Sequence, residues 1–109
     1  MTRVHLGEFE QVLLLALAQI GDDASGGRVG ALIEDRTGRV VSPGAIYTAF
    51  QRLERRGFVT SAFGDPTPQR GGKRRKLYRL RPAGARALAD MQSALARMTR
   101  GLKPRATTR

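Results

Sequence analysis

The 109-residue sequence has no cysteine, no tryptophan and a single histidine, and these absences exclude several kinds of chemistry. Without cysteine the chain forms no disulfide and offers no thiolate as a nucleophile or ligand. His5 alone would need a cluster of carboxylates to complete a metal site, and the acidic residues are scattered along the chain. We therefore expect no cofactor, no metal site and no enzymatic activity.

Long hydrophobic runs are also missing. The longest apolar run, from Val12 to Ala18, is far shorter than the roughly 20 residues that cross a bilayer. The first five residues, Met1 to His5, lack the organisation of a signal peptide. We therefore expect a cytoplasmic protein with no membrane partner. A chain of 109 residues is one folded unit with a small core, which association between chains would stabilise.

Acidic residues become scarce in the second part of the chain. Residues 1–64 contain seven Lys or Arg and seven Asp or Glu, whereas residues 65–109 contain thirteen and two. Seven of the thirteen lie between Arg70 and Arg81, with no acid among them. Self-repulsion opposes such a concentration of charge unless a partner compensates it, and the commonest such partner is a phosphate backbone. A solvated basic loop or a disordered tail would give the same pattern.

Residues 6–20 give the strongest helix signal. One apolar stripe repeats at helical spacing and comprises Phe9, Val12, Leu13, Ala16, Leu17 and Ile20. Leu14, Leu15 and Ala18 are also apolar but lie off this stripe, which predicts burial on a second side. In so short a chain we expect that side to face another subunit. A central helix in the core of a monomer is the alternative.

Two more helices are expected before residue 58. Ser25 is a suitable N-cap for a short helix that Gly38 ends, and Ser42 with Pro43 opens a third helix that ends at Gly57. The third helix has a buried stripe of Ile46, Ala49, Phe50 and Leu53. The rest of its surface is rich in side chains that bond to phosphates and base edges. We predict a DNA-recognition face of Ser42, Gly44, Ala45, Tyr47, Thr48, Gln51, Arg52 and Arg55, with ordinary helix surface as the alternative.

The basic run falls at a predicted hairpin. Residues 58–63 and 75–80 have the pattern of two strands. The segment between them is rich in proline and glycine, which excludes a helix and indicates a turn. The residues expected to contact phosphates at the hairpin tip are Arg70, Gly71, Gly72, Lys73, Arg74 and Arg75.

Pro82 starts a last helix with a repeating apolar seam. Its seam residues recur at spacings of three and four, and two heptads are too few for a free coiled coil, so the seam must pack on something larger. The apolar first helix, in this subunit or its mate, is the candidate. We predict a homodimer through Leu14, Ala18, Leu88, Met91, Leu95, Met98 and Leu102, with an intramolecular core as the alternative. Residues 103–109 are expected to form a disordered basic tail.

Three helices, a two-stranded hairpin and a fourth helix follow the order of a winged helix-turn-helix, a mostly helical α+β fold. We assign residues 1–81 to this DNA-binding domain and residues 82–102 to a dimerisation helix. The expected function is transcriptional regulation through double-stranded DNA. The alternative is a protein-interaction or RNA-binding module that uses the basic hairpin. RNA reading favours exposed aromatic rings, and the chain has only four Phe and two Tyr.

Three segments resemble the PadR family of bacterial regulators: residues 6–17, 44–57 and 70–80. The specific part is the block from Tyr47 to Glu54, Tyr-Thr-x-Phe-x-Arg-Leu-Glu, followed about twenty residues later by Arg-Gly-Gly and a basic residue. The resemblance covers about residues 6–90. The short C-terminus is similar to that of the smaller subfamily, which has a single dimerisation helix.

This resemblance implies a homodimeric repressor that binds a palindromic operator. It also implies release by a small effector, hydrophobic or phenolic, and we expect Met91 and Met98 to line such a site near the dimer seam. Two residues depart from the family pattern. Ser25 stands where the family usually has Tyr, and Arg81 stands where it usually has Thr, so the last helix lacks its usual cap.

Overall fold

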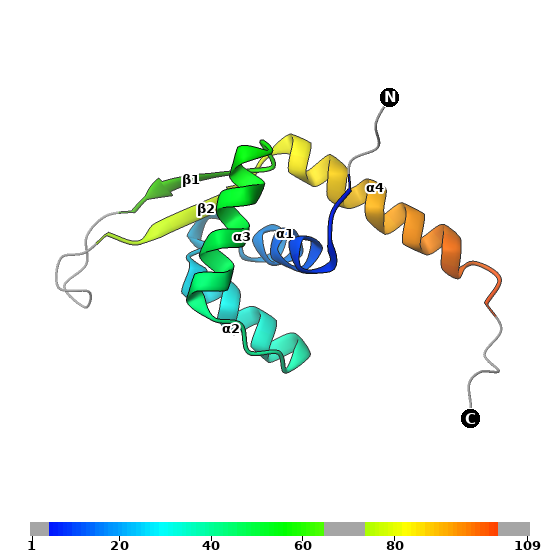
Figure 1. The fold of residues 1–109 in the computed structure, drawn as a ribbon, viewed down its shortest axis with the longest axis horizontal. Helices are drawn as coiled ribbons and strands as arrows, with labels where there is room; N and C mark the ends of the chain where they lie inside the picture. The colour runs from blue at the N-terminus through cyan, green and yellow to red at the C-terminus, as the bar shows by residue number, and fades with distance from the viewer. Residues whose placement is uncertain (1–4, 65–73, 103–109) are drawn as a thin grey trace.

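The structure, a computed structural model, describes residues 5–64 and 74–102 of the chain. The elements, in chain order, are α1 (Glu8–Ile20), the 3-10 helix η1 (Gly21–Asp23), α2 (Gly26–Thr37), α3 (Pro43–Arg55), β1 (Val59–Phe63), β2 (Lys76–Leu80) and α4 (Pro82–Thr99). In Figure 1 the first three helices form the body, the hairpin extends to one side and α4 runs to the other. This arrangement confirms the predicted fold class. The expected tail and most of the hairpin tip lie outside the described residues.

The helix ends follow the predicted capping residues. Oγ of Ser25 accepts a hydrogen bond from the N–H of Arg28 at 3.2 Å, and Oγ of Ser42 accepts one from Ala45 at 3.1 Å. Gly38 closes α2 with a φ of 75°, a conformation that glycine adopts without strain. Arg81 makes no side-chain cap at the start of α4. The local sequence therefore determines where α2 and α3 begin.

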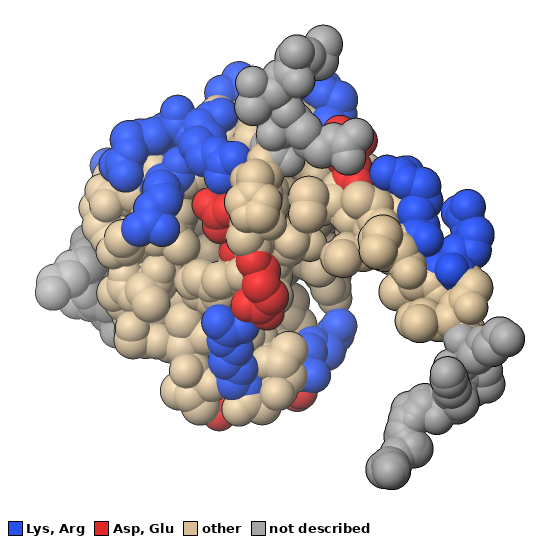
Figure 2. Space-filling view, turned by 45° about the vertical axis from the view of Figure 1, so that its right-hand side comes forward, with Lys and Arg blue, Asp and Glu red and all other residues tan. Residues whose placement is uncertain are grey.

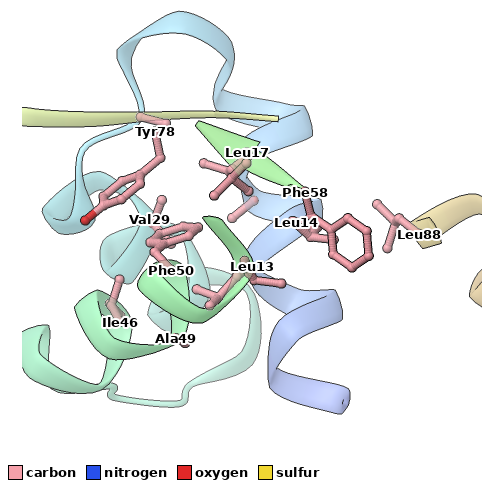
Figure 3. Close-up of a cluster of buried hydrophobic side chains, with 14 of the residues drawn as sticks. Leu13, Leu14, Leu17, Val29, Ile46, Ala49, Phe50, Phe58, Tyr78 and Leu88 are labelled. Atoms are coloured by element: carbon pink, nitrogen blue, oxygen red, sulfur yellow. The ribbon is translucent and has the colours of Figure 1, made fainter. Parts of the chain in front are cut away.

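Helix α1 is the centre of the core. It contacts α2, α3, α4 and β2, and its buried residues are Leu13, Leu14, Ala16 and Leu17. Figure 3 shows these side chains directed toward Phe50 of α3 and Tyr78 of β2. The rings of Phe50 and Tyr78 are stacked, with centroids 4.1 Å apart and planes 17° apart. This stack joins α3 rigidly to the hairpin.

Two assignments to a dimer interface are corrected by this core. Leu14 has no exposed surface within the single chain, so it cannot contact a partner. Leu88 is only 6% exposed and points toward Phe58 in Figure 3, so it also belongs to the core of the single chain. The expectation failed because α1 is surrounded by the chain's own elements. Ala18 is exposed and keeps its place as a candidate contact.

The hairpin is attached to the body at both ends of its described part. Its strands are antiparallel, with Val59 opposite Leu80 and Phe63 opposite Lys76. The N–H of Tyr78 donates to the carbonyl of Ala24 at 2.9 Å, next to the start of α2. The base of the hairpin therefore has a fixed position beside α2 and α3.

The second half of α4 stands away from the body. Figure 2 shows this part of the helix separated from the rest of the molecule, with its own group of basic side chains. The apolar side chains of Leu95, Met98 and Leu102 are 53%, 79% and 74% exposed. An apolar seam left open in this way needs a partner to bury it. Among the described residues, none of the helices has the length and apolar character that a membrane crossing requires.

Candidate nucleic-acid interface

The predicted recognition residues lie together on the outer surface of α3. Ser42, Gly44, Ala45, Tyr47, Thr48, Arg52 and Arg55 are exposed and Gln51 is half-buried, whereas Ile46, Ala49, Phe50 and Leu53 are buried on the opposite side. The division follows from helical periodicity, because the buried stripe and the polar face alternate every three or four residues. A polar face backed by a packed core can meet a partner surface without deforming the domain.

Tyr47 and Gln51 form a pair on this face. The side-chain amide of Gln51 donates to the hydroxyl of Tyr47 at 3.1 Å, one helical turn apart. The pairing leaves the amide oxygen and the second N–H of Gln51 for a ligand. It also restrains the side chain, which lowers the entropy lost when a base edge or a phosphate is bound.

Lys76 extends the face from α3 onto the hairpin. Its Nζ lies 5.2 Å from the centroid of the Tyr47 ring, a cation–π distance. It also lines a small hollow with Gln51, Glu54 and Arg55. Sequence reasoning ended the predicted wing contacts at Arg75 and missed this residue. Its position as the first residue of a strand that pairs beside the recognition helix could have identified it.

The hairpin residues predicted to bind phosphates divide into three groups. Arg70, Gly71, Gly72 and Lys73 lie outside the described residues. Arg74 is exposed and remains a candidate contact. Arg75 instead donates to Asp23 at 2.7 Å, and its side chain is 28% exposed. Because Arg75 is held within the chain, we leave it out of the proposed contact surface.

Two acids of η1 bind the basic side chains next to them. Asp23 accepts from both Arg28 and Arg75, and these hydrogen bonds hold the pKa of its carboxyl below the ordinary value of 3.8. Asp22 lies 3.3 Å from Arg79. The pairs connect η1 with α2 and β2, so they fix the base of the hairpin. The sequence placed Asp22 and Asp23 in a turn and gave no sign of their partners, which lie up to 52 and 57 residues away in the chain.

The described residues contain no group of three or more acidic or histidine side chains arranged to hold a metal ion. What the geometry offers is a non-catalytic surface: a polar helix face, two neighbouring cations and a hairpin fixed against them. Together with the order of elements, this defines a winged helix-turn-helix protein.

Comparison with known proteins identifies its family. The model of the transcriptional regulator PadR-like family matches residues 14–90. The chain therefore belongs to the PadR-like family of transcriptional regulators. No curated protein sequence gives a significant match.

Solved structures agree with this family. A transcriptional regulator from Clostridium thermocellum is 26% identical, with a TM-score of 0.67 over 82% of this chain and 83% of that one. A PadR family regulator from Eggerthella lenta is 25% identical, with a TM-score of 0.67 over 84% and 77%. PadR of Bacillus subtilis, solved in complex with operator DNA, is 19% identical and has a TM-score of 0.65 over 91% of this chain and 53% of that one. At that identity the likeness is one of fold.

Proposed function

We propose that this regulator is a homodimeric repressor that binds a palindromic operator through the polar face of α3. The observation that carries the proposal is the exposed array of Tyr47, Thr48, Gln51, Arg52 and Arg55 on a helix whose other side is locked in the core. The operator complex of the Bacillus subtilis protein supports it, because that protein has the same fold and binds DNA.

The dimer would be formed by the open seam of α4. Leu95, Met98 and Leu102 are exposed in the single chain and are spaced for helix packing. Ala18 and the half-buried Met91 lie at candidate contact positions as well. Two α3 helices held by this seam would enter successive major grooves about 34–36 Å apart on one side of the duplex. The two-fold symmetry of the dimer would match a palindromic site.

The surface offers two kinds of DNA contact. Arg74 and Lys76 on the hairpin would bind phosphates, which adds affinity but no sequence preference. Gln51 has the amide geometry that pairs with adenine in the major groove, and Arg52 or Arg55 can pair with guanine or with phosphate. Occupation of a promoter site by the dimer would block transcription. A small effector that changes the distance between the two α3 helices would release it, and a coupling free energy of about 1–3 kcal/mol is enough.

The test begins with selection of bound sequences from random duplex DNA, followed by affinity measurements on the selected site. Gln51→Ala should lose preference at one base pair and keep its affinity for other changes in the site. Arg74→Ala should weaken binding to all sequences and reduce the salt slope by about 0.9 for the phosphate contact removed. Arg97→Ala, on the far part of α4, is the matched control and should change neither.

Two outcomes would contradict the proposal. If no palindromic sequence is enriched, α3 does not read an operator as part of a dimer. If single-stranded RNA binds more tightly than duplex DNA at matched salt, the module is an RNA binder. In that case the exposed rings of Tyr47 and Phe63, which are 46% and 59% exposed, would be its stacking platform.

A further inference from the structure

A cleft of about 690 Å³ lies between α2, the first turns of α3 and the base of the hairpin. Tyr47, Arg74 and Lys76 form part of its lining, so it opens onto the surface proposed to bind DNA. Clefts of about 300–1,000 Å³ are the usual size for small organic ligands. This cleft is much larger than a single phosphate group requires.

Three aromatic rings surround one ammonium group in the cleft. Nζ of Lys76 lies 5.2 Å from the ring centroid of Tyr47. The rings of Phe63 and Tyr78 lie 5.9 and 6.0 Å from the same nitrogen. Tyr78 is fixed by its stack on Phe50, whereas Phe63 is 59% exposed. The faces of such rings attract a flat apolar ligand, and the nearby ammonium attracts a negative group.

The opposite wall is the smooth surface of α2. Gly26, Gly27, Gly30 and Ala31 line it, so little side-chain volume projects into the cleft. A Cβ at Gly30 would come within 3.2 Å of Ile46, which shows how closely α2 approaches α3 there. A Cβ at Gly27 would meet only the hydroxyl of Ser25, at 4.0 Å. A flat wall facing aromatic rings favours a planar ligand over a branched one.

The charges of the lining favour an anion at the hairpin end. Arg75 is already paired with Asp23, so Arg74 and Lys76 supply the positive charge that a ligand would meet. Glu34, the acid of the lining, belongs to α2 and would repel a negative group from that side. We propose that the cleft binds a small planar aromatic anion, with its ring beside Tyr47 and its negative group at Lys76.

Such a ligand would act as a competitor of DNA, a consequence that rests on the proposed function. It would occupy Tyr47, Arg74 and Lys76, three of the side chains that the DNA surface requires. Regulation would then follow from direct competition at each α3, with no change in dimer spacing. The ligand site itself is complete within one chain, so its existence does not depend on DNA binding or on the dimer.

The binding test uses the full chain without DNA and 2-naphthoate as the probe, followed by calorimetry and by naphthoate fluorescence. We expect one naphthoate per chain. Ala31→Leu, which projects volume into the cleft from α2, should weaken binding at least tenfold. Asp35→Leu is the matched control, because Asp35 is an exposed residue of the same helix that does not line the cleft, and its affinity should equal that of the wild type.

The role of charge is tested with the uncharged analogue 2-naphthylmethanol and with inorganic phosphate. We expect the uncharged analogue to bind at least tenfold more weakly than naphthoate, and Lys76→Gln to remove this preference. Lack of naphthoate binding at millimolar concentration, equal binding by Ala31→Leu, or displacement by phosphate alone at equal concentration would overturn the proposal. The last result would identify the cleft as a seat for a DNA phosphate.

The effect on DNA is measured separately on a duplex that the wild type binds. Naphthoate should raise the apparent Kd for DNA in proportion to its own occupancy, and Ala31→Leu should bind DNA normally but resist naphthoate. Naphthoate binding without any effect on DNA affinity would overturn the competition. Failure of the protein to bind any duplex would contradict the proposed function and leave the cleft to be decided by the binding test alone.

Discussion

At the scale of single residues, Gly84 is the position that packing restricts most clearly. A Cβ there would collide with the carbonyl oxygen of Phe58 and come within 3.0 Å of Leu80. Both neighbours belong to the junction between the hairpin and α4, so neither can move alone. Glycine at this position therefore allows α4 to cross the backbone next to β1.

We predict that Gly84→Ala destabilises the protein by about 1–3 kcal/mol, the usual cost of overpacking. The measurement is urea unfolding at fixed protein concentration, because association would otherwise shift the midpoint. Gly44→Ala is the control: no atom lies within 4 Å of a Cβ at Gly44, and this change should stabilise α3 by about 0.4–1 kcal/mol. Equal stability of the two variants would show that α4 has room to shift.

Asp23 gives a prediction for pH dependence. Its pKa is lowered by Arg28 and Arg75, so the folded state binds this proton more weakly than the unfolded state does. The stability contributed by the ionised carboxyl is therefore complete above the ordinary pKa of 3.8 and is lost as pH falls through the lower value. Asp23→Asn should be less stable than the wild type at neutral pH, and the difference should shrink under acid conditions.

The same titration of Asp22→Asn provides the control. Asp22 is 89% exposed and lies 3.3 Å from Arg79, and exposed pairs of this kind contribute little to stability. Urea unfolding between pH 7 and pH 3 should therefore separate Asp23→Asn from the wild type and leave Asp22→Asn close to it. A pH-independent difference for Asp23→Asn would mean that its hydrogen bonds, and not its charge, hold the hairpin.

At the scale of elements, α4 lacks an N-cap that a single change can supply. Arg81 has the extended backbone of a capping residue, with φ −94° and ψ 159°, but its side chain makes no cap hydrogen bond. Arg81→Thr should place a hydroxyl within reach of the free N–H groups of the first turn and stabilise α4 by about 1 kcal/mol. Thermal unfolding followed by circular dichroism measures the change.

Arg81→Ala separates capping from charge in that experiment. It removes the same positive charge from the helix N-terminus, where a cation is unfavourable, but adds no acceptor. We expect only a part of the stabilisation given by Thr. Equal gains from the two variants would show that removal of the charge accounts for the whole effect.

Much of the element order could be predicted because its signals are local. Ser25 and Ser42 cap the helices that follow them, and proline and glycine mark the hairpin. The burial of Leu14 could not be predicted, because an all-round apolar helix looks the same whether its second side meets another subunit or its own chain. Only the third dimension decided between these alternatives.

The candidate site was predicted to the same extent. The polar face of α3 follows from periodicity, which acts within one helix. The pairing of Arg75 with Asp23 and the placement of Lys76 beside Tyr47 depend on how the hairpin docks on the helices. The cleft depends on three elements at once, and no short sequence pattern records such an arrangement.

At the scale of the whole molecule, the body and the second half of α4 have separate tasks. The radius of gyration of 16.4 Å exceeds the value of about 13 Å expected for a compact chain of this length. The excess comes with a helix that leaves the body and exposes Leu95, Met98 and Leu102, as Figures 1 and 2 show. A body with a closed core and an arm with an open apolar seam is the form expected of a protomer in a dimer.

Met98→Glu tests that dimer directly. Met98 is 79% exposed in the single chain, so a charge there costs the monomer little, whereas in a packed seam it would be buried without a partner. We expect sedimentation equilibrium to give a monomer for Met98→Glu and a dimer for the wild type at the same concentration. Because each half-site alone is held by one α3, the variant should also bind operator DNA at least tenfold more weakly.

Ser93→Glu is the control for this change, because it introduces the same charge on an exposed part of α4 away from the seam. It should remain a dimer and lose operator affinity only by the small amount that one added negative charge costs. Circular dichroism of Met98→Glu should match the wild type, since the core around α1 does not include this residue. A dimeric Met98→Glu with normal operator affinity would place the interface elsewhere and leave the open seam without a role in assembly.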